Sequence, residues 1–432
     1  MPAPTTGWAE LHDSLQETGE FQTIAGTQLM QFGTAQKPLI GANWIPETKV
    51  VMNTYKEKQI RYRVFPALDS ARYSPAQMQP SGLLQGEFLV DLGYQNTADQ
   101  LTANDLDALR LALENDQVGA TSGEARLIDF MSNMTYRLVL KNEMDRWESL
   151  IMRRVTRRGT AGYSEDVEFY AEPGNQIIVN QDGDWSGTEA DPKGWYSKYD
   201  SGAEAFDPIT EVLLPAKDRL EDLGYRIDAI VMPRVLGNAF QRNPLVERWS
   251  NSRVTVDINA NLSGISQRPT RQIANDLLFA NDLPAITVYN TGYATETGYR
   301  RFMTPVSAPN DLFDYIVIIA NVDRESELYI EEEDRSILLD NVIGYHAIGT
   351  VPGMSSPGRR IFSEAQMQHP MGIYAECIQA SLPVIQHPQG IMTLAVPKRA
   401  KSQDQLDAWK GSGITPLITK KEYKALNLPV AA

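Results

Sequence analysis

The sequence is poor in the residues on which most protein chemistry depends. Its single cysteine, Cys377, excludes an intrachain disulfide and any metal site built from clustered cysteines. Because Cys377 lies in an apolar stretch, a buried and inert thiol is favoured over a nucleophile. The four histidines, His12, His346, His369 and His387, lack metal-ligand spacing, and His346 lies in a strand-like run that favours a packed side chain. We therefore predict no metal ion and no cofactor.

Catalytic motifs are missing as well. There is no phosphate-binding Gly-x-x-x-x-Gly-Lys-Ser/Thr loop and no His-Glu-x-x-His pattern. Residues 353–358 have the wrong spacing for a nucleophile elbow, and Asp182 and Asp184 begin like a calcium loop that lacks its later ligands. The acidic run at 331–334 is typical of a solvated turn, because paired catalytic carboxylates face each other across a cleft. The sequence predicts a protein that is not an enzyme and has no catalytic residues.

Long apolar runs and a signal segment are also absent. No stretch reaches the roughly 18 apolar residues of a transmembrane helix, so we predict no membrane span. Residues 1–7 have neither a basic start nor an apolar core, and we expect the protein to stay in the cytoplasm in which it is made. A chain of 432 residues is long enough to bury a sizeable core in about two or three domains.

Positive charge is scarce except at the C-terminal end. The chain carries 55 acidic and 40 basic residues, a net charge of −15, which argues against sequence-specific DNA binding. Residues 398–432 contain seven basic and three acidic residues, a net charge of +4, so the rest of the chain carries −19. An acidic body repels enclosed DNA, as a container that must release its contents requires. The simpler alternative is that the acidity only keeps the protein soluble.

Residues 1–48 are predicted to form an extended arm. Trp8, Leu11 and Leu15 have helical spacing, which predicts a short amphipathic helix near the start. The remainder is rich in Thr, Gln, Gly and Pro and holds too few apolar residues for a core of its own. Such an arm packs on another element or another subunit.

Residues 49–95 are predicted to form two strands joined by a loose tip. The first strand is rich in β-forming residues and, on an acidic protein, is basic, with Lys56, Lys58, Arg61 and Arg63. A lone hairpin is marginal in water, so we expect this one to lie on a neighbouring subunit, where complementary charge would fix its register. A solvated hairpin is the open alternative. The predicted hinges are Gly41, Gly82, Gly86 and Gly93.

The longest predicted helix spans residues 121–158, and its first half carries an apolar stripe at Leu127, Met131, Met134 and Leu138. Thr121 and Glu124 form a capping box at its start, and four arginines between Arg153 and Arg158 complement the helix dipole at its end. The Trp-rich loop that follows, at 183–195, suggests packing contacts.

Residues 207–345 alternate helices and strands, which indicates an α/β domain. Among them, residues 233–249 are predicted to form a helix interrupted near Asn243 and Pro244, and residues 312–322 are predicted to form a strand. Asp207 and Pro208 open its first helix, and Pro215 is predicted to kink that helix. Strands broken by Gly and Pro then return, and the last of them ends at Val396.

In this order the elements resemble the major capsid proteins of tailed bacteriophages, of the lambda type, which have the Hong Kong 97-type fold. The resemblance covers roughly residues 49–397 and rests on order and spacing, with no single diagnostic motif. It implies an α+β fold, and the role of the basic tail stays open. The implied parts are an N-terminal arm (1–48), an extended β-hairpin loop (49–98), a peripheral domain (99–206) with a spine helix (121–158), an α/β axial domain (207–345), return strands to the peripheral domain (346–397) and the tail (398–432).

The resemblance also implies a function. The chain would be a structural subunit that self-assembles through hexamers and pentamers into an icosahedral head shell around double-stranded DNA, made in the host cytoplasm and located in the virion. Its partners would be copies of itself, a portal protein, a separate scaffolding protein, packaged DNA without sequence-specific contact and, as an open candidate, a decoration protein; no membrane is involved. No residue pair maps onto a covalent cross-link, so a non-covalent shell is predicted. Candidate inter-subunit contacts are Lys56, Lys58, Arg61, Arg63, Phe65, Arg72, Tyr73, Trp8 and Leu11.

Two alternatives remain open at the level of sequence. One is an encapsulin-like shell of a bacterial compartment, which shares the fold and encloses cargo enzymes. The other is an undescribed enzyme that uses the acidic residues between Asp182 and Asp191.

Overall fold

The computed structural model contains two compact units, and both mix helices and strands, which confirms the predicted α+β class. Unit 1 comprises residues 1–57, 87–146 and 345–384, and unit 2 comprises residues 58–86, 147–344 and 385–432. The residues described are 12–13, 16–17, 39–62, 83–102, 105, 119–158, 164–179, 194–196, 206–248, 271–295, 298–305, 313–321, 343–351, 353–366, 372–398 and 418–419.

Unit 1 is built on a five-stranded sheet. The strand order is β1-β13-β15-β14, and β4 pairs with β15 along the part of that strand that also pairs with β14. Both of these pairings with β15 are antiparallel, whereas β1 is parallel to β13. The strands are β1 (Glu47–Lys49), β4 (Gly93–Leu101), β13 (Gly344–Ile348), β14 (Arg360–Gln366) and β15 (Gly372–Ile385), and a short 3-10 helix, η1 (Ile40–Asn43), precedes β1.

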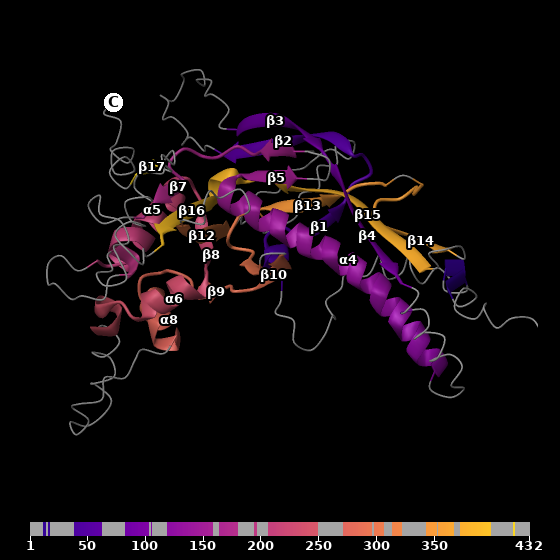
Figure 1. Cartoon of the computed structure of the whole chain (residues 1–432). Helices are drawn as coiled ribbons and strands as arrows, with labels where there is room; N and C mark the ends of the chain where they lie inside the picture. Colours follow the sequence, from indigo (N-terminus) through magenta and orange to yellow (C-terminus); the bar gives the residue numbers. More distant parts are fainter. Residues whose placement is uncertain are drawn as a thin grey trace, which may run out of the picture. The chain divides into compact units, whose positions relative to one another are not determined.

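The long helix α4 (Gly119–Met152) supplies the apolar core of this unit (Figure 1). Its residues Leu127, Met131, Met134 and Leu138 follow at intervals of three or four, so they fall on one face of the helix. That face confirms the apolar stripe expected for the first half of the helix. It packs on the sheet residues Ile361, Ile373, Ala375 and Cys377.

The ends of α4 differ from the prediction. The helix begins at Gly119, two residues before Thr121, so Thr121 is not its N-cap, and it ends at Met152 rather than at Arg158. Arg153 adopts a left-handed backbone conformation with φ of 57°, which stops the helix. The buried Arg153 guanidinium donates to the carbonyls of Leu150 and Ile391, and burial lowers its pKa to about 9. The remaining arginines of the run lie in β5 (Arg154–Arg158), which pairs with β6 (Ser164–Glu168).

Unit 2 is built on a six-stranded sheet with the order β17-β7-β16-β12-β8-β9. β12 pairs antiparallel with both β16 and β8, and the outer pairs β16–β7, β7–β17 and β8–β9 are parallel. The resemblance placed the strand that ends at Val396 in the peripheral sheet. Instead β16 lies in the sheet of unit 2, since its apolar run matches β12 and is buried on both faces. The strands are β7 (Gln176–Ile178), β8 (Arg226–Met232), β9 (Ile286–Val288), β12 (Phe313–Asn321), β16 (Ile391–Pro397) and β17 (Ile418–Thr419).

The first helix of unit 2 begins at the predicted cap. The Asp207 carboxylate accepts from the backbone N–H of Ile209 and the hydroxyl of Thr210. A π-helix, η5 (Ile209–Leu213), leads into α5 (Leu214–Asp222). Pro215 therefore stands where the π-helix passes into α5, in the first turn of α5, where its missing N–H breaks no bond of that helix, and the kink at Pro215 stays a prediction. Unit 2 also contains α6 (Arg234–Gln241), α8 (Arg271–Phe279), the 3-10 helices η3 (Gly194–Tyr196) and η7 (Pro388–Gly390), and the paired strands β10 (Gly292–Thr295) and β11 (Gly298–Arg301).

The Trp-rich loop contributes to the core of unit 2, as expected. Trp195 is buried, stacks on Phe240 and donates its indole N–H to the carbonyl of Leu236. Tyr196 donates to the buried Asp314 carboxylate. Trp185 and Tyr199 lie outside the described residues.

The predicted hairpin is present as a two-stranded sheet of β2 (Thr54–Tyr62) and β3 (Leu83–Asp91). The boundary predicted at residue 98 falls inside β4, which belongs to the sheet of unit 1. Likewise, the predicted peripheral segment 99–206 is divided between the units after Arg146. None of the described helices is long and apolar enough to cross a membrane.

Candidate functional site

Among the described residues, no group of three or more His, Cys, Asp or Glu side chains could hold a metal ion. Cys377 is fully buried, and burial raises its pKa to about 11, so it is not a nucleophile at neutral pH. His346 is fully buried in β13. The acidic positions Asp182, Asp184 and 331–334 lie outside the described part of the chain.

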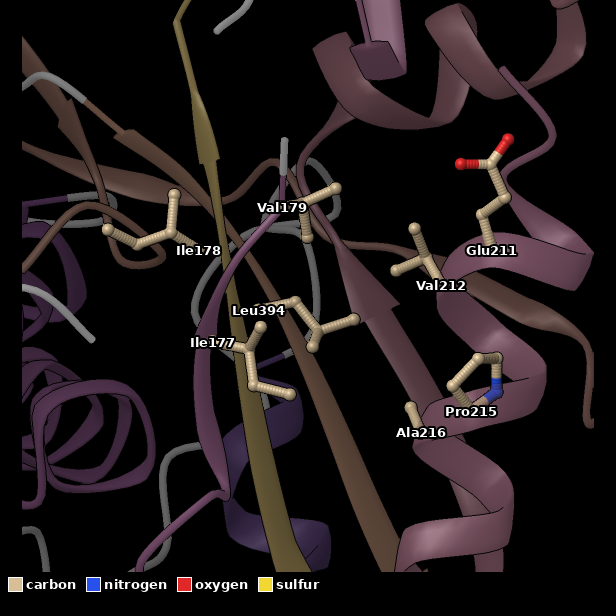
Figure 2. A pocket seen from close by; sticks show the side chains of 8 residues that line it. All are labelled: Ile177, Ile178, Val179, Glu211, Val212, Pro215, Ala216 and Leu394. Atoms are coloured by element: carbon tan, nitrogen blue, oxygen red, sulfur yellow. The ribbon is translucent and has the colours of Figure 1, made fainter. Parts of the chain in front are cut away.

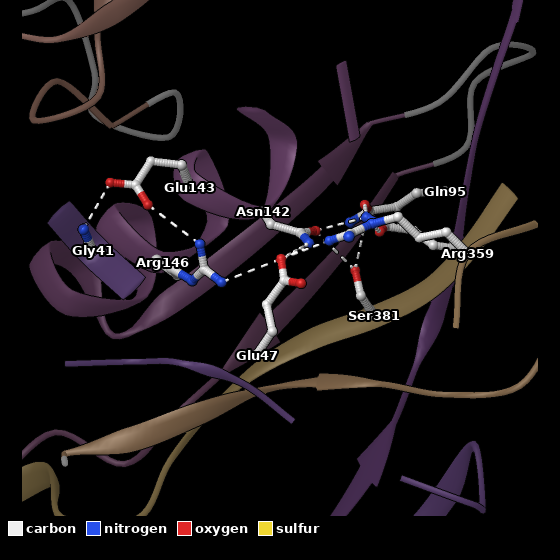
Figure 3. Close-up of polar contacts among 9 residues, drawn as sticks. Gly41, Glu47, Gln95, Asn142, Glu143, Arg146, Arg359 and Ser381 are labelled. Atoms are coloured by element: carbon white, nitrogen blue, oxygen red, sulfur yellow. Dashed lines mark hydrogen bonds and ion pairs between the residues drawn. The ribbon is translucent and has the colours of Figure 1, made fainter. Parts of the chain in front are cut away.

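The densest polar arrangement is a buried network in unit 1 centred on Glu47 of β1 (Figure 3). One carboxylate oxygen of Glu47 accepts from Arg359 Nη2 at 2.6 Å and from Asn142 Nδ2 at 2.9 Å. Arg146 Nη2 lies 3.4 Å from the same oxygen. Asn142 and Arg146 come from α4, and Arg359 precedes β14. The Glu47 carboxylate therefore ties three separate segments together.

The two arginines decide the charge state of Glu47. Burial by itself would raise the pKa of this carboxyl. The positive charges of Arg359 and Arg146 and the hydrogen bonds from Asn142 and Arg359 outweigh that effect and hold the pKa below its ordinary value of 4.5. Glu47 is therefore ionised at neutral pH, and the network is a buried ion pair with two cations.

A second carboxylate extends the network toward the N-terminal segment. Glu143 accepts from Arg146 Nη1 at 3.3 Å and from the backbone N–H of Gly41 at 2.9 Å. A Cβ on Gly41 would lie only 2.8 Å from Glu143 Oε2. Gly41 is therefore a packing glycine and not the predicted hinge. Gly93 pairs with Ser381 inside the sheet and is not a hinge either, while Gly82 is outside the described residues.

Amide side chains continue the network across the sheet. Gln379 of β15 accepts from Arg359 Nε at 2.9 Å and donates to Asn142 Oδ1 at 2.6 Å and to the Gln95 side chain. The Ser381 hydroxyl also donates to Asn142 Oδ1. Such a connected set of partners satisfies buried polar atoms that would otherwise cost free energy.

Asn53 holds the root of the β2–β3 pair on unit 1. Its amide donates to the carbonyl of Thr350 at 2.8 Å, and its side-chain oxygen accepts from the N–H of Thr350 at 2.9 Å. Its backbone carbonyl accepts from the N–H of Leu92, so both ends of the pair are joined at one residue. A Cβ on Gly349 would overlap the Asn53 side-chain oxygen, so this clamp requires glycine at position 349. Close to the Asn53 clamp in the sequence, the hydroxyls of Tyr55 and Tyr345 form a hydrogen bond of 2.8 Å.

Three large apolar side chains are exposed beside this clamp. Val51 is 75% exposed, Met52 is 67% exposed, and Tyr94, whose hydroxyl accepts from the Asn53 amide, is 61% exposed. We call these three residues the root patch. They are among the most exposed large apolar residues of the described chain, and the clamp fixes the backbone that presents them.

The predicted contact residues are placed only in part. Lys56, Lys58 and Arg61 lie in β2, as expected, and nothing further is described for their side chains. Sequence reasoning missed the Glu47 network and the root patch. Val51 and Met52 fall in the stretch predicted as the first strand of the hairpin, and no local signal indicated that they lie between β1 and β2. Outside the described residues lie Arg63, Phe65, Arg72, Tyr73, Trp8 and Leu11.

No protein-family model matches the sequence, and no curated protein matches it. Solved structures do match over most of the chain. A prophage protein from Escherichia coli CFT073, provisionally assigned as a capsid protein, is 15% identical with a TM-score of 0.49, over 88% of this chain and 98% of its own. The mature capsid of bacteriophage PhiM1 is 7% identical with a TM-score of 0.42, over 86% and 90% of the two chains.

A compartment shell is among the matches as well. The SrpI encapsulin from Synechococcus elongatus PCC 7942 is 10% identical with a TM-score of 0.39, over 89% of this chain and 98% of its own. At such identities, the function of this chain rests on its own residues.

Proposed function

We propose that this chain is the major capsid protein of a tailed bacteriophage, a structural subunit that self-assembles through hexamers and pentamers into an icosahedral shell around double-stranded DNA. The observation that carries the proposal is the order of elements: a two-stranded excursion, a helix of 34 residues, an α/β unit and strands that return to the helix.

On this proposal, unit 1 is the peripheral domain and α4 is its spine helix. The six-stranded sheet of unit 2 and its helices are the axial domain, and β2 with β3 forms the extended loop. Of the return strands, β14 and β15 close the peripheral sheet, and β16 joins the axial one. The proposed N-terminal arm, residues 1–48, ends in η1 and β1, which belong to unit 1: Gly41 bonds to Glu143 of α4, and β1 pairs with β13.

The root patch is the best-defined candidate for a contact between subunits. Monomeric proteins rarely expose large contiguous apolar patches, and such patches mark interaction sites. We place a second copy of the chain on Val51, Met52 and Tyr94. The contact would continue along the basic strand with Lys56, Lys58 and Arg61, whose charge complements a neighbour that is acidic outside its tail. The further proposed contacts are Arg63, Phe65, Arg72, Tyr73, Trp8 and Leu11.

The charge distribution supports a container for DNA. A body with a net charge of −19 repels phosphates, so packaged DNA would be confined by the wall without being bound to it. A portal protein for DNA entry and a separate scaffolding protein complete the proposal, with the virion as the final location.

Electron microscopy of the purified protein, with size-exclusion chromatography beside it, tests the proposal. We expect closed shells, tubes or ring-shaped capsomers, formed alone or with a co-expressed scaffold. A monodisperse monomer or dimer under all these conditions would contradict it. Particles that enclose protein cargo in the native host, with no DNA, would point instead to a compartment shell.

A matched pair of variants tests the root patch. Met52→Asp places a charge on an exposed apolar residue, so the fold should persist, as judged by circular dichroism, while assembly is lost. Asn133→Asp adds the same charge at an exposed position of α4 and should assemble like the parent chain. Shells from Met52→Asp as abundant as those of the parent would exclude the root patch as a contact. Deletion within residues 69–86, at the predicted tip, should also block assembly and leave the fold intact.

A further inference from the structure

The basic C-terminal tail contributes a strand to the sheet of unit 2. Ile418 pairs with Ile177 and Thr419 with Ile178, which makes β17 the outermost strand, parallel to β7. On its other edge β7 pairs with β16, where Leu394 is opposite Ile177 and Ala395 is opposite Ile178. The outer edge of β7 is therefore an acceptor for an extended segment.

β7 itself is firmly held (Figure 2). Ile177, Ile178 and Val179 line a small, mostly apolar cavity of about 30 Å³ together with Leu394 of β16 and the facing helix residues Glu211, Val212, Pro215 and Ala216. The preceding Asn175 donates to the carbonyls of Gln389 and Ile391, and the Val179 N–H donates to the carbonyl of Ala395. The acceptor edge therefore stays in place whether or not a strand occupies it.

The donor strand β17, in contrast, makes only a few contacts with the sheet. β17 consists of two residues, and a pairing of this length offers only a few backbone hydrogen bonds, each worth about 0.5–1.5 kcal/mol. An identical tail from another copy makes the same pairs in the same register. Replacing one by the other therefore costs no contact energy, which is the general condition for domain swapping.

The connection to β17 is also longer than the return to its own β7 requires. Sheet geometry puts the end of β16 and the start of β17 roughly 15 Å apart, because they are two strand spacings across and about three residues along. Residues 398–417, twenty in all, can span about 65 Å when extended. The same tail can therefore reach a neighbouring subunit.

We propose that the outer edge of β7 is an acceptor site for the C-terminal strand of a second copy of the chain, filled by the chain's own tail in the free subunit and by a neighbour's tail in the shell. The proposal rests on the proposed shell function, since close packing of identical subunits supplies the neighbouring tail at a high effective concentration. Net charge favours docking of either tail, the chain's own or a neighbour's, because a tail of +4 approaches a body of −19.

Mixed assembly of two variants, each with one added cysteine, tests the exchange. Ile178→Cys subunits and differently tagged Thr419→Cys subunits are co-assembled and oxidised, and the disulfides are mapped by mass spectrometry. Cys377 is buried and stays out of the reaction. We expect dimers linked from 178 to 419, and none when Asp222→Cys, an exposed position on α5, replaces Ile178→Cys. Shells that contain no 178–419 dimers would contradict the exchange. So would an Ile178→Cys/Thr419→Cys double variant in which the disulfide forms only within one chain. Either result leaves the proposed shell function unaffected.

A second design leaves β7 unchanged. A photoreactive side chain at position 419 is introduced into isotopically light subunits, which are assembled with unmodified heavy subunits and irradiated. Light-to-heavy cross-links to the peptide that contains Ile177–Val179 support the exchange, and exclusively light-to-light links within single chains refute it. If electron microscopy shows no particles in either design, both the proposed shell function and the proposed exchange are contradicted.

Discussion

The two units bury different kinds of side chains. Around Glu47, unit 1 encloses two guanidinium groups, two carboxylates and three amide or hydroxyl side chains, all of which are hydrogen-bonded or ion-paired. At the centre of unit 2, Ile316, Val317, Ile318 and Ile319 of β12 are fully buried between β16 and β8. Beside its apolar cluster on α4, unit 1 therefore depends on charge complementarity, which is sensitive to geometry and pH, whereas the central strands of the unit 2 sheet depend on apolar packing.

This difference predicts where a single substitution lowers the free energy of unfolding most. An apolar core loses the transfer free energy of the atoms removed and gains a cavity. A buried ion pair that loses one partner leaves the other charge uncompensated in a medium of low dielectric constant, which costs more. The root of the β2–β3 pair follows β1 directly, so the position of the proposed extended loop depends on the more sensitive of the two cores.

The largest effect is expected for Glu47→Leu. Removing the carboxylate leaves Arg146 and Arg359 buried without their shared partner, and the free energy of unfolding should fall by about 3–5 kcal/mol. Urea denaturation at pH 7, followed by circular dichroism, measures this. Glu364→Leu, at an exposed position of β14, is the control and should change stability by less than about 0.5 kcal/mol. A loss below 1 kcal/mol for Glu47→Leu would mean that the network contributes little.

Truncation in the apolar core should come next. Ile318→Ala creates a cavity in the middle strand of the unit 2 sheet and should cost about 2–5 kcal/mol, whereas Ile318→Val should cost about 0.5–1.5 kcal/mol. Because no titrating group is removed, both losses should be equal at pH 7 and pH 5. A loss that changes with pH would contradict the contrast between the two cores.

Acid should weaken unit 1 through Glu47. The pKa of this carboxyl is lower in the folded chain than its ordinary value of 4.5, so its stabilising contribution is complete above pH 4.5 and is lost as the pH falls through the folded value. Glu47→Gln keeps the shape of the side chain and removes the charge. The variant should be less stable by about 1.5–3 kcal/mol at pH 7 and should lose less stability on acidification. Parallel slopes of unfolding free energy against pH for the two proteins would exclude Glu47 as the source.

The smallest effect is expected for an exposed ion pair of the same unit. Arg137 Nη2 lies 2.6 Å from Asp99 Oδ2, but the two side chains are 45% and 39% exposed. Solvent screens such pairs, so Arg137→Gln should change stability by about 0–1 kcal/mol, and salt should reduce even that. A loss comparable to that of Glu47→Leu would show that burial does not set the difference.

Local patterns in the sequence predicted the elements that local physics determines. The spacing of Leu127, Met131, Met134 and Leu138 indicated the buried face of α4, and the β-branched run of β12 indicated a core strand. Asp207 followed by proline indicated the start of a helix, and Asn243 before Pro244 indicated the interruption that separates α6 from the next turn of helix. Each of these signals lies within a few residues of the feature it predicts.

The remaining features depend on contacts that no local pattern reports. Arginine is an ordinary helix former, so the stop at Arg153 was not predictable without its bond to Ile391, 238 residues away. The partners of Glu47 lie 95 and 312 residues along the chain, and a lone glutamate in a three-residue strand gives no sign of them. The sheet to which β16 belongs is also decided by pairing partners and not by its own apolar residues.

The low reactivity of Cys377, the only thiol of the chain, has a practical consequence. With a pKa of about 11, Cys377 is ionised in roughly one molecule in ten thousand at pH 7, and maleimide and iodoacetamide reagents react with the ionised form. One cysteine placed on the surface would therefore take a single fluorescent dye without prior removal of the native residue. Pairs of such labels on different copies would report, by energy transfer, how subunits meet in real time as particles grow.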